Sequence, residues 1–469
     1  MTEQKYELGM IGLGVMGRNL VLNIADHGYS VSGYDKDISK VQELQSEVGS
    51  NTINAAQSLD EFVSVLSTPR AIMMLVPAGQ VVDNVIRDLI PRLERGDLII
   101  DAGNSHFKDT DLRSKSLGEK GILYMGVGIS GGEDGARHGP SLMPGGPKEA
   151  YERVRPIFEA VAAHVDGVPC VTYLGPGSAG HYVKMVHNGI EYGLMQLIAE
   201  SYDLMKRGLE LSDAELSIIY GNWNENVLNA YLIEITSRIF AQVDEQTGER
   251  LIDVILDEAK QKGTGMWTSQ SAMDIQVPTP VIDAAVVARN LSAMKSERES
   301  ASKNIKVRAT RFKGDRDAIL NQLKSAMYAS MIITYAQGMS QLHAASKVYE
   351  YSLNLEDVAR IWRGGCIIRA ALLENIQAAF HAHPDLSNLL NTDHLSQTVI
   401  SKQADLRAVV NQAVKLGIPI PCLMASLAYF DGYRSAWLPA NLIQAQRDDF
   451  GAHTYERVDA KGVFHTHWE

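Results

Sequence analysis

The sequence predicts a doubly wound α/β domain, followed by a large all-helical domain and a C-terminal tail. Short β-rich runs alternate with amphipathic helical stretches in the first part of the chain, which is typical of a largely parallel sheet covered by helices. After the glycine-rich joint at 174–180, strand patterns nearly vanish and helical periodicity runs to about Tyr433. We therefore expect an N-terminal domain at 1–178, a helical domain at 179–437 and a tail at 438–469.

Six runs of the first domain have the apolar, β-branched composition of buried strands. Amphipathic stretches such as VVDNVIRDLIPRL (81–93) lie between them and predict the crossover helices. The expected strands are YELGMIG (6–12), YSVSGYD (29–35), AIMMLVP (71–77), DLIIDAG (97–103), LYMGVGIS (123–130) and CVTYLG (170–175).

Length and composition describe an ordinary globular chain. Its 469 residues are 45% hydrophobic and 21% charged, which suits two or three domains. A formal charge of −12 argues against a general nucleic-acid or anionic-membrane binder. No run has the length of a membrane span, and no signal peptide is recognised. Three widely spaced cysteines predict neither a disulfide framework nor a zinc site and fit a cytoplasmic protein with buried free thiols.

The first strand and the helix after it are joined by a G-x-G-x-x-G turn. Such glycines allow a tight turn and close backbone approach, and the helix N-terminus favours a pyrophosphate, so we predict a Rossmann-like dinucleotide site. Asp35 follows the second strand about 20 residues on, as a ribose ligand does. A structural turn is the alternative to this interpretation. The turn comprises Gly12, Leu13, Gly14, Val15, Met16 and Gly17.

Two further strands end in polar and glycine residues. DAGNS (101–105) contains Asn104, and GVGISGGEDGARHG (126–139) contains Ser130, Gly131 and Gly132. Open α/β sheets bind ligands at the carboxyl ends of their strands. These loops are therefore candidates for ligand contact, with plain glycine-rich loops as the alternative.

The stretch GHYVKMVHNGIEYG (180–193) predicts a helix with an unusual polar face. Lys184, His187, Asn188 and Glu191 recur at i, i+3, i+4 and i+7, which places them together on one side. Such a face is ordinarily a solvated one with weak ion pairs. The spacing alone does not decide between solvation and chemistry.

Motifs along the whole chain resemble those of the 6-phosphogluconate dehydrogenases of the pentose phosphate pathway. GLGVMG, DAGNS, ISGGEDGA, MPGG, GHYVKMVHNGIEYG, KGTGMWTSQSA and LPANLIQAQRDDFGAHTYE occur in the order found in that family. The resemblance implies an enzyme that oxidises C3 of 6-phosphogluconate by hydride transfer to NADP and then decarboxylates the 3-keto intermediate. Ribulose 5-phosphate and CO2 are the implied products.

The resemblance also assigns roles to residues. Lys184 corresponds to the general base for the C3 hydroxyl and Glu191 to the acid that protonates C1 of the product. An enclosed site would lower the pKa of the lysine and raise that of the glutamate, as both roles require. The positions that correspond to substrate contacts are Asn104, Ser130, Gly131, Gly132, His187, Asn188, Tyr192, Lys262, Arg289, Arg447 and His453.

Arginine suits the phosphate because its planar fork makes bidentate, charge-assisted bonds. In the family, the residues matching Arg447 and His453 come from the partner subunit. A homodimer with shared active sites is therefore implied by the resemblance.

The chain departs from the family pattern in four places, one of which spans three residues. Asp35, Lys36 and Asp37 replace the usual Asn-Arg-Thr, and Pro77 replaces a lysine between Val76 and Ala78. Met266 replaces a second lysine of the KGTG motif, and Asp449 replaces a tyrosine. The first two departures lie in the expected coenzyme site, which comprises residues 12–17, Asp35, Lys36, Asp37, Val76, Pro77, Ala78 and Asn104. An aspartate at the end of the second strand is typical of NAD sites, so we expect NAD to be used at least as well as NADP.

Two alternatives compete with this hypothesis. Another β-hydroxyacid dehydrogenase, such as one acting on 3-hydroxyisobutyrate, would share the dinucleotide domain, an S-G-G loop and a catalytic lysine, but those relatives are shorter and lack the tail. The second alternative is a non-catalytic dinucleotide-binding or assembly protein. The presence of both Lys184 and Glu191 argues against it.

Overall fold

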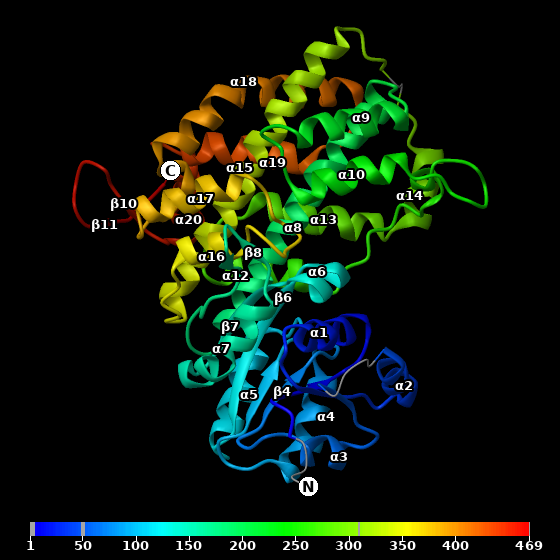
Figure 1. Cartoon of the computed structure of the whole chain (residues 1–469). Coiled ribbons are helices and arrows are strands. Elements are labelled where there is room, and N and C mark those ends of the chain that lie inside the picture. Colours follow the sequence, from blue (N-terminus) through cyan, green and yellow to red (C-terminus); the bar gives the residue numbers. More distant parts are fainter. Residues whose placement is uncertain (1–4, 48–51, 308–309, 469) are drawn as a thin grey trace.

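The computed structural model describes residues 5–47, 52–307 and 310–468 and has the predicted fold class. Figure 1 shows an α/β domain at one end of the molecule and a larger helical domain at the other, with β6 (Leu123–Ser130) and α8 (Ala179–Asp203) at the junction. The domain boundaries that the sequence suggests stay a prediction.

A seven-stranded sheet forms the centre of the first domain. Its strand order is β3-β2-β1-β4-β5-β6-β7, and all neighbours are parallel except β6 and β7. This confirms the largely parallel, doubly wound sheet. The strands are β1 (Leu8–Ile11), β2 (Val31–Tyr34), β3 (Ile53–Ala55), β4 (Ala71–Met74), β5 (Leu98–Asp101), β6 (Leu123–Ser130) and β7 (Ser141–Gly145).

Five of the six strands predicted from the sequence are present, and the sixth prediction is wrong. The segment CVTYLG runs beside β7 but makes only a single bridge, from Val171 to Leu142, because its other bonds to β7 do not form a continuous ladder. Strands β3 and β7 were not predicted from the sequence. The pattern of β7 is obscured by Pro144, which is tolerated because β7 is an edge strand.

Helices cover both faces of the sheet and create two separate cores. Leu20 of α1 and Phe158 of α7 pack on one face, whereas Phe62 of α3 and Val82 of α4 pack on the other. The helical elements of this domain are α1 (Val15–Asp26), α2 (Ile38–Glu47), α3 (Leu59–Ser64), α4 (Gln80–Leu89), η1 (Ile90–Arg92), α5 (Phe107–Gly118), α6 (Gly132–His138) and α7 (Lys148–Val161), with the short pair β8 (His164–Val165) and β9 (Val168–Pro169) after them.

The helical domain is built around two long helices, α8 (Ala179–Asp203) and α15 (Arg316–Val348), which pack against each other. Their central turns are buried on nearly every side. The other helices are η2 (Leu204–Gly208), α9 (Asp213–Asn224), α10 (Tyr231–Ala241), α11 (Leu251–Val254), α12 (Thr264–Asp274), α13 (Pro280–Ser292), α14 (Lys295–Asn304), α16 (Leu355–Ile361), α17 (Leu372–Ala382), η3 (Leu389–Asn391), α18 (Asp393–Leu416) and α19 (Pro421–Tyr433).

The start of α8 is seated directly on the sheet because glycines leave room for it. A Cβ added at Gly180 would collide with the carbonyl oxygens of Gly126 and Met143, and one added at Gly128 would collide with the Cβ of Lys184. Close approach of this kind requires glycine. The first turns of α8 are therefore fixed against β6, whose carboxyl end carries Ser130.

The tail forms a small unit of its own. It contains α20 (Ala440–Gly451) and the hairpin of β10 (Tyr455–Glu456) and β11 (Val463–Phe464), which projects from the helical domain in red in Figure 1. The hairpin was not predicted from the sequence.

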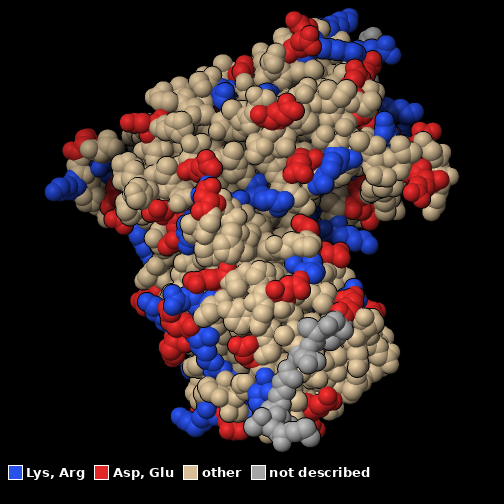
Figure 2. Space-filling view, viewed as in Figure 1, with Lys and Arg blue, Asp and Glu red and all other residues tan. Residues whose placement is uncertain are grey.

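Positive and negative side chains are interspersed over the face in Figure 2, which shows no large patch of one sign. Within the described parts of the chain, no helix has both the length and the apolar character needed to cross a membrane. Cys170, Cys366 and Cys422 are free and buried, as the sequence analysis expected.

Candidate active site

The polar face of α8 is buried. Lys184 is 6% exposed, His187 is fully buried and Asn188 is 8% exposed, whereas the side chain of Glu191 keeps 21% exposure. This burial excludes a solvated face with weak ion pairs. Because burying an amine and a carboxyl group is unfavourable unless partners compensate, these groups need contacts within the protein.

The side chains of this face contact one another. The His187 Nδ1 lies 3.1 Å from Asn188 Oδ1, 3.5 Å from Lys184 Nζ and 3.8 Å from Glu191 Oε2. The other ring nitrogen, Nε2, lies 3.2 Å from the hydroxyl of Ser130 at the end of β6. Asn188 Nδ2 donates to Thr264 Oγ1 of α12 at 3.1 Å. His187 thus links the helix to the glycine-rich loop of the sheet.

Burial shifts all three titratable groups toward their neutral forms. It lowers the pKa of Lys184, against the attraction of Glu191, and raises the pKa of Glu191, against the attractions of Lys184 and Arg289. The pKa of His187 is well below its usual value because of burial and the neighbouring Lys184. A lysine that loses its proton more readily and a carboxyl group that keeps one are the pair needed for base and acid catalysis.

We predict that Gly128→Ala removes most activity, although residue 128 has no functional group. The new methyl group would overlap Lys184 and displace it, and a shift of about 1 Å in a catalytic group can cost about 10²-fold in rate. Gly118→Ala is the control, because a Cβ there meets nothing within 4 Å. Steady-state kcat is the measurement, and a Gly128→Ala enzyme within twofold of the wild type would contradict the packing argument.

The segment 362–367, which was not recognised from the sequence, packs against the loop that follows β6. Trp362 lies edge-on to His187, with ring centroids 5.6 Å apart, and the Ile367 N–H points to the Ser130 hydroxyl at 3.4 Å. Gly365 carbonyl accepts from Ser141 N at 2.7 Å. The glycine pair at 364–365, in a domain otherwise made of helices, was the available signal.

Two adjoining cavities, of about 540 and 710 Å³, lie at the carboxyl edge of the sheet. The glycine turn separates them, since Gly14 lines both. A Cβ at Gly12 or Gly17 would collide with the backbone, whereas one at Gly14 would meet nothing, so open space lies in front of the N-terminus of α1. This arrangement fits a pyrophosphate between a nucleoside in one cavity and a second ring in the other.

The smaller cavity contains the residues that follow β2. Asp35 lines it and accepts hydrogen bonds from Leu13 N at 2.8 Å and Asp37 N at 2.9 Å. Lys36 is ion-paired with Asp88 at 2.8 Å, and Lys40 lies 3.9 Å from Asp35. Each lysine of the cavity therefore has an aspartate beside it.

The larger cavity extends toward the helical domain. Its lining includes several of the residues proposed from the sequence as coenzyme contacts, and their role stays a prediction. These residues are Val15, Met16, Gly17, Val76, Pro77, Ala78 and Asn104. Lys262 and Trp267 line its other side, and α12, which begins next to them, packs on α8. Ile129 lines it too, one residue from Gly128, which touches Lys184. The lining therefore comes within one residue of Gly128, on which Lys184 packs.

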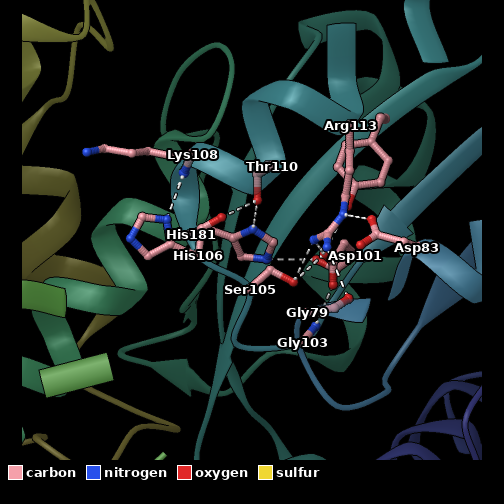
Figure 3. Close-up of polar contacts among 11 residues, drawn as sticks. Gly79, Asp83, Asp101, Gly103, Ser105, His106, Lys108, Thr110, Arg113 and His181 are labelled. Atoms are coloured by element: carbon pink, nitrogen blue, oxygen red, sulfur yellow. Dashed lines mark hydrogen bonds and ion pairs between the residues drawn. The ribbon is translucent and has the colours of Figure 1, made fainter. Parts of the chain in front are cut away.

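Figure 3 shows a polar network that holds two loops lining this cavity, one containing Gly79 and the other containing Gly103. Asp101 accepts from the Ser105 hydroxyl at 2.6 Å, from Gly103 N at 3.1 Å and from the Tyr124 hydroxyl at 2.9 Å. Arg113 donates to Gly79 O at 3.1 Å and pairs with the Asp83 carboxylate at 2.7 Å.

His181 connects that network to α8. Its Nε2 lies 3.0 Å from the Asp101 carbonyl oxygen and its Nδ1 lies 2.7 Å from the Thr110 hydroxyl (Figure 3). Burial lowers the pKa of His181, so the ring is neutral at pH 7. His181 precedes Lys184 by one turn, and the network therefore joins the cavity loops to the candidate base.

The structure brings some of the predicted phosphate contacts together. The Arg289 guanidinium lies 3.5 Å from the centroid of the Tyr192 ring, next to Glu191. Lys262 lies in the larger cavity. Arg447 and His453 are exposed in the tail, and the side chains that they contact, Gln444 and Phe450, belong to the tail too. A single chain does not bring these two residues to the α8 face.

Comparisons with known proteins cover nearly the whole chain. A family model described as the NAD binding domain of 6-phosphogluconate dehydrogenase matches residues 7–175, and one described as the C-terminal domain of that enzyme matches residues 180–468. An NADP(+)-dependent, decarboxylating 6-phosphogluconate dehydrogenase of Bacillus subtilis is 52% identical over 99% of both chains. The decarboxylating 6-phosphogluconate dehydrogenase of Escherichia coli is 50% identical over 99% of both.

A solved structure is similar along its entire length. It is the Plasmodium falciparum 6-phosphogluconate dehydrogenase, described as apo, with NADP+ and with 6-phosphogluconate. The TM-score is 0.95 and the identity 44%, covering 98% of this chain and 100% of the other.

Proposed function

Because this chain belongs to the 6-phosphogluconate dehydrogenase family, we propose that it oxidises and decarboxylates 6-phosphogluconate to ribulose 5-phosphate and CO2. The observation that carries this proposal is the pairing of the buried Lys184 with the largely enclosed Glu191 on one face of α8, a helix that packs on β6 of the coenzyme domain. A cytoplasmic location, as the sequence analysis expects, is part of the same proposal.

Lys184 acts first as a base. Its neutral amine, favoured by burial, takes the proton of the C3 hydroxyl while the hydride leaves C3. The nicotinamide supplies the acceptor for that hydride. The C1–C2 bond then breaks, and the electron pair of that bond forms the C2=C3 double bond of the enediol. Lys184, now protonated, returns its proton toward the C3 oxygen in this step. CO2 leaves from C1.

Glu191 acts last, as an acid. Burial raises the pKa of the carboxyl group and so favours its protonated form, which gives its proton to the enediol carbon that becomes C1 of ribulose 5-phosphate. Ser130, His187 and Asn188 lie between the two groups and offer hydrogen bonds to the substrate hydroxyls and carboxylate. The cluster of Tyr192 and Arg289 is the part of the α8 face best suited to the phosphate.

We predict that Glu191→Gln impairs oxidation less than overall turnover, since protonation of the product follows CO2 loss. The measurement compares the single-turnover formation of reduced nicotinamide with the rate of solvent deuterium entry at C1. Glu225→Gln, in an exposed position, is the control. Equal losses in both rates would count against this order of roles.

NADP is the coenzyme that the family implies, and the Bacillus subtilis relative is named for it. In this chain the 2′-phosphate would lie near Asp35, in a cavity whose lysines are already paired with aspartates. Hydrogen bonds from Ser39 lower the pKa of the nearby Asp37, which keeps its negative charge. Repulsion of this kind can cost several kcal/mol. The arrangement supports NAD being used at least as well as NADP.

We therefore predict that Asp35→Asn combined with Lys36→Arg shifts the coenzyme preference toward NADP. Asp88→Asn should move it in the same direction by a smaller amount, because it frees Lys36. The measurement is kcat/KM for both coenzymes at saturating 6-phosphogluconate. A wild-type preference for NADP of a hundredfold or more would contradict the proposal.

A homodimer with shared sites is also part of the proposal. The tail exposes large apolar side chains, since Leu442 is 61% exposed, Ile443 60% and Phe450 75%. Trp437, which directly precedes the tail, is 63% exposed. Such a cluster on an otherwise ordinary surface marks an interaction site. A partner chain that covers it would also bring Arg447 and His453 near a substrate phosphate.

The proposed function is tested by assaying the purified protein with 6-phosphogluconate and with 3-hydroxyisobutyrate, using each coenzyme. We expect reduction of the nicotinamide with 6-phosphogluconate alone. Comparable rates with 3-hydroxyisobutyrate would favour the shorter dehydrogenases as the better analogy. Absence of reduction under every condition would favour a non-catalytic protein.

A further inference from the structure

We propose that Asp448 is a positioning residue that folds the tail into the shape in which Arg447 and His453 can meet a substrate. The inference rests on the proposed function, in which the tail completes the active site of a partner chain. Asp448 lies near the end of α20 and is fully buried within a tail that is otherwise mostly exposed.

The Asp448 carboxylate accepts four hydrogen bonds. Oδ1 accepts from Thr454 N at 3.0 Å and from His465 Nδ1 at 2.9 Å, and Oδ2 accepts from Thr466 N at 3.0 Å and from Trp468 Nε1 at 2.9 Å. Burial alone would raise the pKa of this carboxyl group, but these donors hold it below its usual range. Because each of its two oxygens accepts two hydrogen bonds, the carboxylate is held in one position and orientation.

The same carboxylate secures a strained turn around His453. Ala452 and Thr454, on either side of it, adopt left-handed backbone conformations with φ of +47° and +61°. Residues other than glycine keep such conformations only where their surroundings hold them. Here Ala452 N donates to the Asp448 carbonyl at 2.9 Å, and Thr454 N donates to its carboxylate. Asp448 therefore determines where His453 stands relative to α20.

Arg447 is tied to the same turn. Its guanidinium donates to Gln444 Oε1 at 3.0 Å, and the Gln444 amide donates to the Thr454 carbonyl at 2.6 Å. The His453 N–H reaches the Arg447 carbonyl at 3.4 Å. The two candidate substrate contacts are thus held by one cluster of bonds with Asp448 at its centre.

The donors to Asp448 come from the end of the described chain. Three of the four bonds are made by His465, Thr466 and Trp468, beyond the β10–β11 hairpin. The hairpin brings these residues back to α20, with Tyr455 paired to Phe464. All four donors belong to the tail, so its shape is set by contacts that need no partner chain.

The test is Asp448→Asn, with Asp459→Asn as the matched control. Asparagine keeps the shape but replaces one acceptor oxygen with an NH2 group that faces donors. Asp459 lies in the same tail, exposed and paired with Arg457. The readouts are kcat, the KM of each substrate and the mass of the dimer.

For Asp448→Asn we expect the KM for 6-phosphogluconate to rise about tenfold or more, as loss of a charged hydrogen bond implies. The coenzyme KM should stay within twofold, the dimer should persist, and Asp459→Asn should match the wild type. A merely structural role would instead reduce kcat at unchanged KM. An unchanged KM for 6-phosphogluconate in Asp448→Asn, with or without a lower kcat, would overturn the inference. An equal rise of this KM in Asp459→Asn would overturn it too.

A second variant covers the case in which Asp448→Asn fails to assemble. Trp468→Phe removes one donor and keeps the carboxylate, and it should give a stable dimer with a KM for 6-phosphogluconate raised about threefold. No change in that KM would overturn the inference. A wild-type protein that does not oxidise 6-phosphogluconate would instead refute the proposed function, so the two failures are distinguishable.

Discussion

Lys184→Met is expected to abolish both hydride transfer and CO2 release while leaving coenzyme binding intact. Methionine fills nearly the same volume, so the close contact with Gly128 is preserved, but it can take no proton from the C3 hydroxyl. A positioned general base contributes about 10²–10⁴-fold to a rate. Steady-state kcat gives the loss, and coenzyme titration by fluorescence shows whether the first domain is unaffected.

Lys120→Met is the control for removing a lysine, because residue 120 is exposed at the end of α5. It should leave kcat unchanged. A Lys184→Met enzyme that keeps more than about a tenth of wild-type kcat would rule out this lysine as the base, since the expected loss is at least ten times larger.

Truncation after Leu438 is expected to remove activity while the sheet domain stays folded. The cores on the two faces of the sheet consist of residues before 175, so coenzyme binding does not depend on the tail. The deletion removes Arg447, His453 and the cluster around Asp448 together. Activity with 6-phosphogluconate and coenzyme binding are the two measurements.

Mixing the truncated chain with the Lys184→Met chain tests whether the tail acts in trans. A mixed dimer would contain one site with an intact lysine from the first chain and a tail from the second. Activity should therefore appear in the mixture although each parent is inactive. No recovery, in dimers shown to have exchanged subunits, would mean that the tail serves its own chain or only folding.

The sequence was most informative where local pattern and chemistry coincide. The alternation of strands and helices, the glycine turn before α1 and the position of Asp35 each depend on a few consecutive residues, and the structure has them as expected. The spacing of Lys184 and Glu191 placed them on one face. It could not show that the face is buried, because burial comes from β6, α12 and α15, which lie far away in the chain.

Contacts between distant segments were not predictable. The link from His181 to the Asp101 carbonyl joins residues 80 positions apart, and the Ile367 N–H lies 237 positions from Ser130. The role of Asp448 was also hidden, because its donors lie beyond an irregular loop. Pro144 concealed β7, since a proline argues against a strand unless the strand is known to be at an edge.

We expect one face of α8 to perform both an oxidation and a decarboxylation on the same substrate. A single turnover of the wild-type protein with 6-phosphogluconate labelled at C1, in which reduced nicotinamide and labelled CO2 are recorded together, tests this claim. We predict one CO2 for each nicotinamide reduced. Reduction without release of CO2 would contradict the claim.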